Sequence, residues 1–144
     1  MRPRLALVPG EPAGIGPELV VRAAQQDWEA QLVVHGDGAT LRRAAQALGL
    51  DIELHRAGET PRSRRSLELV EITHPVVAVF GQPEPANAAS VVESLTCAAR
   101  ACLDGELDGL VTGPVHKAAI NDGGIHFNGT TGLLAAQSGC DVVM

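Results

Sequence analysis

Short runs of apolar residues alternate along this chain with longer stretches in which apolar residues recur every three or four positions. The first pattern is typical of strands and the second of amphipathic helices. Several short runs, such as Leu5–Val8, do not alternate with polar residues, as expected of parallel strands covered on both faces. The pattern predicts strands over residues 5–8, 31–35, 52–55, 67–72, 110–112 and 141–144, and helices over residues 17–26, 39–48, 86–103, 115–121 and 132–138.

Some of these segments carry a more specific expectation. Residues 67–72 alternate and are expected at the margin of the sheet, after an exposed loop over residues 56–66. Residues 76–80 are a further candidate strand. The strand over residues 141–144 is expected to be buried and to need neighbours that do not follow in the sequence. The chain is therefore expected to be the N-terminal part of a longer α/β protein.

Composition narrows the choice of function. The 144 residues suffice for one domain, and 45% hydrophobic content with 2% aromatic content predicts a core of Ala, Val and Leu, as in helix-on-sheet packing. A net charge of −6 and few aromatic residues argue against a nucleic-acid surface. The one basic cluster, Arg62–Arg65, is interpreted as a solvated loop.

The cysteines and the N-terminal residues indicate the cellular compartment in which the protein is expected. Cys97, Cys102 and Cys140 show no metal-ligand spacing, and Cys97 and Cys102 are expected to be small core residues in a reducing environment. No signal peptide precedes the first strand, and no apolar run is long enough to span a membrane. The prediction is a cytoplasmic protein.

Thr112–Lys117, with the sequence Thr-Gly-Pro-Val-His-Lys, is the first candidate site. A buried strand is expected to end here and a helix to open at Pro114, where a missing N–H does no harm. Lys117 is the only lysine beside ten arginines, and it follows His116 directly. The structural alternative is a solvated lysine beside a histidine bonded to the backbone. Strand-to-helix turns of this kind gather where α/β proteins bind ligands, which favours a role in a cleft.

A second turn, Pro9–Glu18, is dense in glycine and proline. Gly14 and Gly16 suggest a dinucleotide-binding loop, but the G-x-G-x-x-G fingerprint requires a third glycine where Leu19 stands. Three glycines in one turn still cost conformational entropy that a plain connector does not need. Glu11 is interpreted as a loop residue and Glu18 as a helix-start residue; a substrate contact is an open alternative for both.

The two turns together closely resemble the 4-hydroxythreonine-4-phosphate dehydrogenase family of vitamin B6 biosynthesis, and the Asn121–Ile125 segment fits as well. The first turn is also similar to the corresponding loop of isopropylmalate and isocitrate dehydrogenases. The resemblance implies an α/β fold, an α/β/α sandwich of that dehydrogenase type, present only as its N-terminal part. It implies that residues 1–127 are mostly first lobe and residues 128–144 cross into the second.

The family resemblance also implies an activity. Members are homodimers that oxidise 4-(phosphooxy)-threonine with NAD or NADP and a divalent metal such as Zn, Mg or Co. The 3-oxo acid formed then decarboxylates to 3-amino-2-oxopropyl phosphate. The family's metal-binding histidines lie beyond position 144, so no metal ligand is expected in this chain, and the chain alone is expected to be inactive. His35, His55 and His74 show no ligand spacing and are interpreted as strand-end or loop residues.

The resemblance carries over to the site residue by residue. Thr131 matches the threonine of the family's Gly-His-Thr-Glu segment, whereas Thr130 replaces its histidine and Gly132 its acid. His126 is interpreted as a loop histidine. The predicted substrate-binding residues are Thr131 and Thr130, and the cleft candidates are Gly10, Glu11, Gly14, Gly16, His116 and Lys117.

Two alternatives stay open. The first is a paralogue that acts on a phosphorylated four-carbon sugar acid, such as threonate or erythronate 4-phosphate, because Thr130 replaces the imidazole that binds substrate in the family. The second is a non-catalytic α/β remnant that kept the scaffold for interactions. Neither alternative involves nucleic acid or a membrane.

Overall fold

The computed structural model describes residues 1–59 and 64–143. Its centre is a five-stranded sheet in the order β3-β4-β2-β1-β5, in which every pairing is parallel. The strands are β1 (Arg4–Val8), β2 (Gln31–Gly36), β3 (Glu53–Arg56), β4 (Ser66–Glu71) and β5 (Gly109–Thr112). The helices are α1 (Gly16–Ala24), α2 (Gly38–Leu48), a short 3-10 turn η1 (Pro85–Asn87), α3 (Ala88–Leu103), α4 (Lys117–Asp122) and α5 (Thr130–Ser138). The α/β class predicted from the alternating pattern is confirmed.

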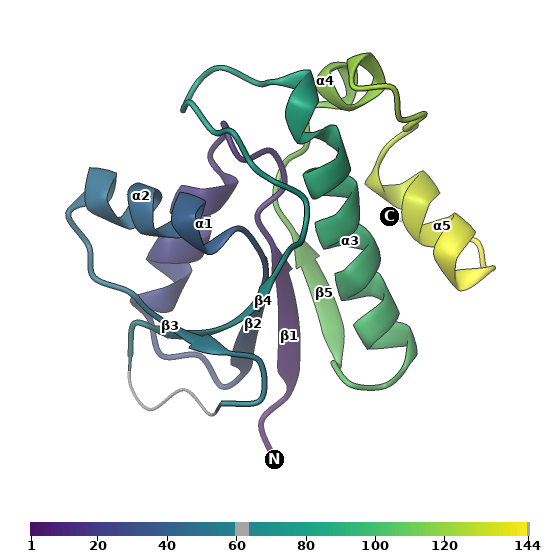
Figure 1. Ribbon diagram of the computed structural model, residues 1–144. Coiled ribbons are helices and arrows are strands. Elements are labelled where there is room, and N and C mark those ends of the chain that lie inside the picture. Colours follow the sequence, from purple (N-terminus) through teal and green to yellow (C-terminus); the bar gives the residue numbers. More distant parts are fainter. Residues whose placement is uncertain (60–63, 144) are drawn as a thin grey trace.

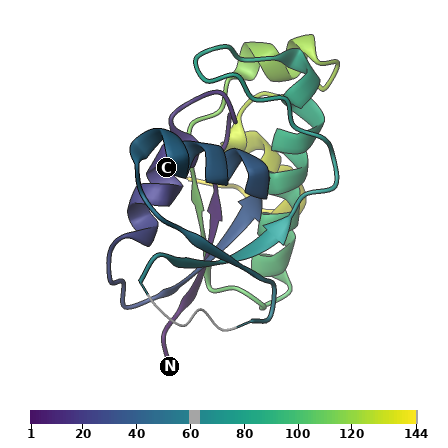
Figure 2. The same ribbon diagram turned by 60° about the vertical axis from the view of Figure 1, so that its left-hand side comes forward.

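Helices cover both faces of the sheet. Figure 1 shows α1 and α2 on one side and α3 on the other, with α5 on the outer side of α3; the turned view in Figure 2 shows the same layering. Leu7, Val34 and Leu69 face α1 and α2, whereas Ala6 and Val8 face α3. Burial on both faces explains why these strands carry continuous apolar runs.

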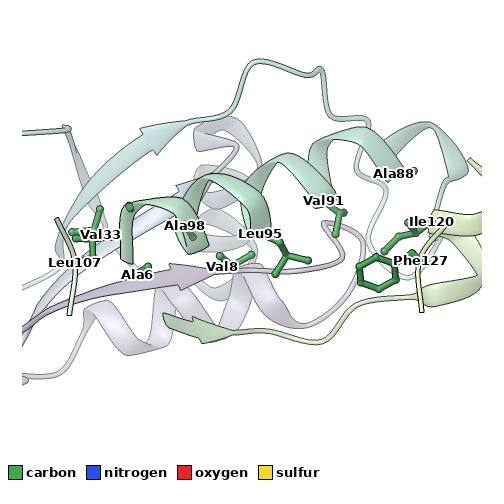
Figure 3. Close-up of a cluster of buried hydrophobic side chains, with 11 residues drawn as sticks. Ala6, Val8, Val33, Ala88, Val91, Leu95, Ala98, Leu107, Ile120 and Phe127 are labelled. Atoms are coloured by element: carbon green, nitrogen blue, oxygen red, sulfur yellow. The ribbon is translucent and has the colours of Figure 1, made fainter. Parts of the chain in front are cut away.

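α3 carries the larger part of the core. Figure 3 shows Val91, Leu95 and Ala98 of this helix above Ala6 and Val8 of β1. Ile120 and Phe127 close the far end of the same cluster and are 1% and 5% exposed. The segment after β5 is therefore anchored to the same core as the central strand.

The helix ends follow local chemistry. Asp37 caps α2, since its carboxylate accepts the backbone N–H of Thr40 at 2.8 Å. Gly49 ends that helix in the left-handed conformation with φ 64°, which glycine adopts without steric cost. Glu18 lies in the first turn of α1, where the positive end of the helix dipole stabilises its negative charge.

The prediction that residues 67–72 form a marginal strand is wrong, because β4 lies between β2 and β3. Glu68 gives residues 67–72 their alternation of apolar and polar side chains, which is typical of a strand with one exposed face. In the structure, however, Glu68 is only 2% exposed. Its carboxylate accepts hydrogen bonds from the Arg4 guanidinium at 3.1 Å, the Gln31 amide at 2.8 Å and the backbone N–H of Gly58 at 2.8 Å. A carboxylate satisfied in this way can be buried inside a sheet.

Residues 76–80 form no strand; they hold only an isolated bridge between Val79 and Gln82. The buried Asn87 side chain accepts the N–H of Val77 at 2.9 Å and donates to its carbonyl at 2.7 Å. These backbone groups are therefore bonded to a side chain instead of a neighbouring strand.

Three further predictions are wrong or fall outside the structure. Cys97 is exposed and is not a core residue, whereas Cys102 is half-buried and packs against the margin of the core; neither is among the buried residues of α3. Residues 141–143 are exposed and form no strand, because no described strand pairs with them. Met144 and part of the Arg62–Arg65 cluster lie outside the described residues.

Among residues 1–59 and 64–143, none of the helices has the length and apolar character needed to cross a bilayer.

Candidate functional site

The two glycine-proline turns meet in space. They follow β1 and β5, which are adjacent parallel strands, so both turns leave the same edge of the sheet. The backbone N–H of Glu11 donates to the carbonyl of Pro114 at 2.9 Å, and that of Gly113 donates to Val8 at 2.7 Å. From β1 the chain continues toward β2 on one side, while β5 lies on the other side. Open α/β sheets bind their ligands at such a switch point.

Close backbone contact explains the glycines in these turns. Gly10 has φ +82°, and a Cβ atom there would lie 2.2 Å from the Pro114 carbonyl oxygen. A Cβ atom at Gly113 would lie 2.2 Å from the Pro9 oxygen, and one at Gly16 only 1.6 Å from it. No side chain fits these gaps, so the glycines hold the two turns against each other.

Glu11 is a loop residue, as predicted, but it is buried at 5% exposure. Its Oε1 accepts the backbone N–H of Ala13 at 3.1 Å, and its carbonyl accepts that of Gly14 at 3.0 Å. The buried Glu11 side chain therefore stabilises the conformation of the loop. Gly14 packs against the Glu11 side chain, with 3.6 Å between Cβ of Glu11 and a Cβ atom placed at Gly14.

The helix after the second turn starts later than predicted. His116 is the N-cap of α4, with an extended backbone at φ −106°, so Pro114 and Val115 precede the helix. His116 Nδ1 accepts the backbone N–H of Ala119 at 3.1 Å, which makes this histidine a capping residue bonded to the backbone. Lys117 is then the first residue of α4, and it is exposed.

Lys117 reaches the start of α5. Its Nζ lies 3.3 Å from the position that a Cβ atom of Gly129 would occupy. Gly129 is the N-cap of α5 with φ 133° and offers no side-chain cap, so the first N–H groups of this helix have no side-chain acceptor from their own cap. Thr130 and Thr131 form the first turn and are half-buried. The structure thus brings the lone lysine next to Gly129, the residue that directly precedes the two threonines.

Asn121 makes this approach possible, and the sequence reasoning did not single it out as a site residue. Its amide nitrogen donates to the carbonyls of Lys117 and Phe127, each at 2.9 Å, and its oxygen accepts the N–H of Phe127 at 3.1 Å. These bonds fold residues 121–127 back so that Gly129 returns to α4. The available signal was an asparagine four residues after the lysine, within a segment rich in glycine.

Other predicted residues lie elsewhere. His126 is exposed and lines a groove of about 610 Å³ between α3 and α5, which Gly129 and Gly132 also border. His35 is buried in β2, and His55 is half-buried in β3. His74 lies in the loop after β4, with its Nδ1 2.6 Å from Glu93 Oε2. Within the part of the chain that the structure describes, no three His, Cys, Asp or Glu side chains are grouped to hold a metal ion.

Comparisons with known proteins point to one family. The family model of the pyridoxal phosphate biosynthetic protein PdxA matches residues 27–144. A 4-hydroxythreonine-4-phosphate dehydrogenase of Xanthomonas axonopodis pv. citri is 56% identical over 145 residues, which are 100% of this chain and 45% of the relative. The chain therefore spans less than half the length of the curated relatives it matches.

Two solved structures support the fold. The crystal structure of a 4-hydroxythreonine-4-phosphate dehydrogenase from Burkholderia phymatum is 25% identical with a TM-score of 0.90, covering 99% of this chain and 45% of that one. A terephthalate 1,2-cis-dihydrodiol dehydrogenase from Burkholderia xenovorans is 26% identical with a TM-score of 0.78, covering 98% of this chain and 42% of that one. Since the family model matches most of the sequence, the chain belongs to the family of the pyridoxal phosphate biosynthetic protein PdxA.

Proposed function

We propose that this chain supplies one wall of the active site of an enzyme that oxidises 4-(phosphooxy)-threonine in vitamin B6 biosynthesis. The observation that carries the proposal is the position of Lys117 beside the start of α5, with its Nζ 3.3 Å from the Cβ position of Gly129. The name of the 56% identical relative supports the reaction and the substrate.

The arrangement suits an anionic group such as a phosphate. The first N–H groups of α5, a helix of nine residues, point out of its N-terminus and carry partial positive charge. Lys117 adds a full positive charge with three donors, and among the described residues it forms no ion pair that would neutralise it. The hydroxyls of Thr130 and Thr131 add neutral donors. We assign these three side chains to the binding of the substrate phosphate or carboxylate.

The cofactors are not assigned to residues of this chain. A dehydrogenase of this family uses NAD or NADP, which accepts the hydride when bound. The Pro9–Glu18 turn does not match the dinucleotide fingerprint, and the described residues do not form a metal site on their own. A divalent metal in the enzyme would need ligands from outside this chain, so we expect the chain alone to be inactive.

The two-lobed organisation is part of the proposal. We assign residues 1–127 mostly to the first lobe and residues 128–144 to the crossover into the second. In support, α5 packs on α3 without a strand of the sheet beneath it and contains no buried residue. A homodimer and a cytoplasmic location stay predictions from the family resemblance.

Binding to the chain itself tests the assigned residues. The chain is titrated with 4-(phosphooxy)-threonine and, separately, with threonine, while the backbone amide signals of residues 129–131 are followed by NMR. We expect only the phosphorylated ligand to shift these signals, and Lys117→Met to weaken binding at least tenfold. Arg56→Met, which removes an exposed charge on β3, is the matched control and should change nothing. Unshifted signals, or equal binding by Lys117→Met, would contradict the assignment.

A phosphorylated four-carbon sugar acid is the second candidate substrate. It is favoured by Thr130, a neutral hydroxyl at the position where the resemblance places a histidine. The same titration with erythronate 4-phosphate separates the two candidates, because both ligands carry the phosphate and only one carries an amino group. Tighter binding of the sugar acid would replace the proposed substrate while keeping the anion site.

A further inference from the structure

His35 is buried in the sheet without a hydrogen bond. It lies in β2 and is 3% exposed. Neither of its ring nitrogens has a partner among the residues that the structure describes. A neutral imidazole carries one donor and one acceptor, and burying either without a partner costs free energy. A histidine held in this way is typical of a group that changes its state when it takes up a proton.

His35 lies on the face of the sheet that α3 covers. Val33, two residues earlier in β2, belongs to the α3 core cluster (Figure 3), and side chains two positions apart in a strand share a face. His35 pairs with Val70 of β4, and Val33 pairs with Glu68 of the same strand. His35 and Glu68 are therefore one pair apart on the same face of adjacent strands. Because such strands lie about 4.8 Å apart, the two side chains can meet.

Glu68 supplies the negative charge that acts on His35. Burial lowers the pKa of His35, and the charge of Glu68 raises it in part. Beyond Glu68 lie Arg4, which is bonded to it, and His55 of β3, which pairs with it in register. The buried side chains that β1 and α3 place on this face carry no charge; they include Ala6, Val8, Ser90, Val91, Ser94 and Leu95.

The carboxylate of Glu68 is fully occupied. Its Oε1 accepts the Arg4 guanidinium at 3.1 Å and the backbone N–H of Gly58 at 2.8 Å. Its Oε2 accepts the same guanidinium at 3.1 Å and the Gln31 amide at 2.8 Å. A carboxylate offers about four acceptor positions, so a further donor can bind only by displacing one of these. Arg4 is charged and is held more strongly than the neutral donors, Gln31 and Gly58.

We propose that His35 and Glu68 form a proton-operated switch. While His35 is neutral, the carboxylate keeps its four hydrogen bonds. When His35 takes up a proton from solvent, both ring nitrogens become donors. The imidazolium then turns toward Glu68 and displaces Gln31 or Gly58 from the carboxylate. The inference does not rest on the proposed function, because it concerns the sheet alone.

The switch links separate parts of the fold. Gln31 begins β2, whereas Gly58 lies in the loop after β3. Release of a neutral donor therefore loosens either the start of β2 or that loop in acid. The regrouping also converts a histidine without partners into a member of an ion pair, which limits the destabilisation that an unpaired buried cation would cause.

An NMR titration of the full chain from pH 7.5 to pH 4.5 tests the switch. The ring signals of His35 give the midpoint of its protonation. The protection factor of the Gly58 amide and the side-chain amide signals of Gln31 report their bonds to Glu68. We expect protection of Gly58 to fall at least fivefold, or the Gln31 signals to shift, with the same midpoint as the His35 ring.

Three variants assign these changes. His35→Leu removes the proton acceptor and should abolish them. Glu68→Gln removes the attracting charge and should weaken proton binding by His35 at least threefold. His55→Leu is the matched control, because His55 is also in register with Glu68 but has its own neighbour, Ser66, at 3.4 Å; it should leave the changes in place. Each variant is first checked for the thermal transition of the unmodified chain.

Four results would overturn the inference. A fall in Gly58 protection that persists in His35→Leu would assign the change to protonation of Glu68 itself, and one that disappears in His55→Leu would assign it to the other histidine. Constant Gly58 and Gln31 signals during titration of the His35 ring would show that the imidazolium does not bind Glu68. A His35 ring that takes up no proton in the folded chain down to pH 4.5 would leave no switch.

Discussion

The backbone N–H of Glu11 donates to the carbonyl oxygen of Pro114 at 2.9 Å, although the two residues lie 103 positions apart in the sequence. This bond joins the turn after β1 to the turn after β5. It exists because the two strands are neighbours and because Gly10 has no side chain between the turns. The candidate site therefore depends on backbone contact as much as on its polar side chains.

Gly10→Ala should destabilise the protein by about 3 kcal/mol, since it combines a positive φ with a Cβ atom 2.2 Å from the Pro114 oxygen. Gly49→Ala is the control, because Gly49 also has a positive φ of 64° but has no atom within 4 Å of its Cβ position. Conformational strain alone predicts a loss of about 1 kcal/mol there. Urea denaturation measures both free energies of unfolding. Equal losses would show that the two turns do not press on Gly10.

Asn121→Ala should loosen the segment that places Gly129 beside Lys117. The substitution removes three hydrogen bonds and leaves backbone groups of Lys117 and Phe127 without this partner, at a cost of about 2 kcal/mol. Hydrogen exchange of the Phe127 amide should accelerate, because that N–H donates to the Asn121 side chain.

The control for Asn121 is Asn128→Ala, which removes the same side chain at an exposed position. This variant should leave the exchange of the Phe127 amide unchanged. If both variants behave alike, the bonds of Asn121 do not fix the loop, and the approach of Lys117 to α5 has another cause.

The strands and helices could be predicted because each has a local pattern. The two turns were recognisable for the same reason, as dense runs of glycine and proline. Their contact was not, because it depends on β1 pairing with β5, and strand order is not encoded in either segment alone. β4 shows the same limit. Glu68 looked like a solvent-facing position, and only the distant Arg4 and Gln31 make its burial tolerable.

The position of Lys117 beside Gly129 was out of reach for a related reason. The distance between them is set by Asn121 and by burial of Phe127 in the α3 core, both of which are tertiary effects. His116 shows the opposite case. Its bond to the backbone is local, and the sequence analysis includes it as the structural alternative. The later start of α4 was not predicted, since a proline at the first helical position is the commoner pattern.

Glu93 should make stability fall in acid. Burial acts to raise the pKa of this carboxylate, but the backbone N–H groups of Thr73 and His74 and the side chains of both residues outweigh it and lower the pKa to about 2. A depressed pKa means that the stabilisation is complete above the ordinary value of 4.5 and is lost as the pH falls toward 2. Glu93→Gln should therefore cost about 2 kcal/mol at pH 7 and almost nothing near pH 2.

Thermal unfolding of Glu93→Gln between pH 2 and pH 7 measures this difference, with Glu29→Gln as the control at an exposed position. The control should follow the unmodified protein at every pH. A loss for Glu93→Gln that is the same at both ends of the range would mean that the charge on Glu93 does not contribute.

His35 should also make stability depend on pH, at a higher pH than Glu93. Its side chain is 3% exposed, and neither ring nitrogen has a hydrogen-bond partner within residues 1–59 and 64–143. Burial lowers the pKa of His35, while the negative charge of Glu68 partly opposes this effect. A histidine whose pKa is lowered by folding binds its proton more readily in the unfolded chain. Stability is therefore lost as the pH falls below the ordinary value of 6.5.

His35→Leu removes both unpartnered nitrogens and the titrating group. It should stabilise the protein by about 1 kcal/mol at pH 7.5 and by more at pH 5.5, since a buried polar atom without a partner costs free energy even when neutral. His55→Leu is the matched control, because His55 is half-buried and lies 3.4 Å from the Ser66 hydroxyl. Urea denaturation at pH 7.5 and pH 5.5 measures the free energy of unfolding of both variants. A His35→Leu variant that is less stable than the unmodified chain at both pH values would show that the His35 imidazole has hydrogen-bond partners in solution.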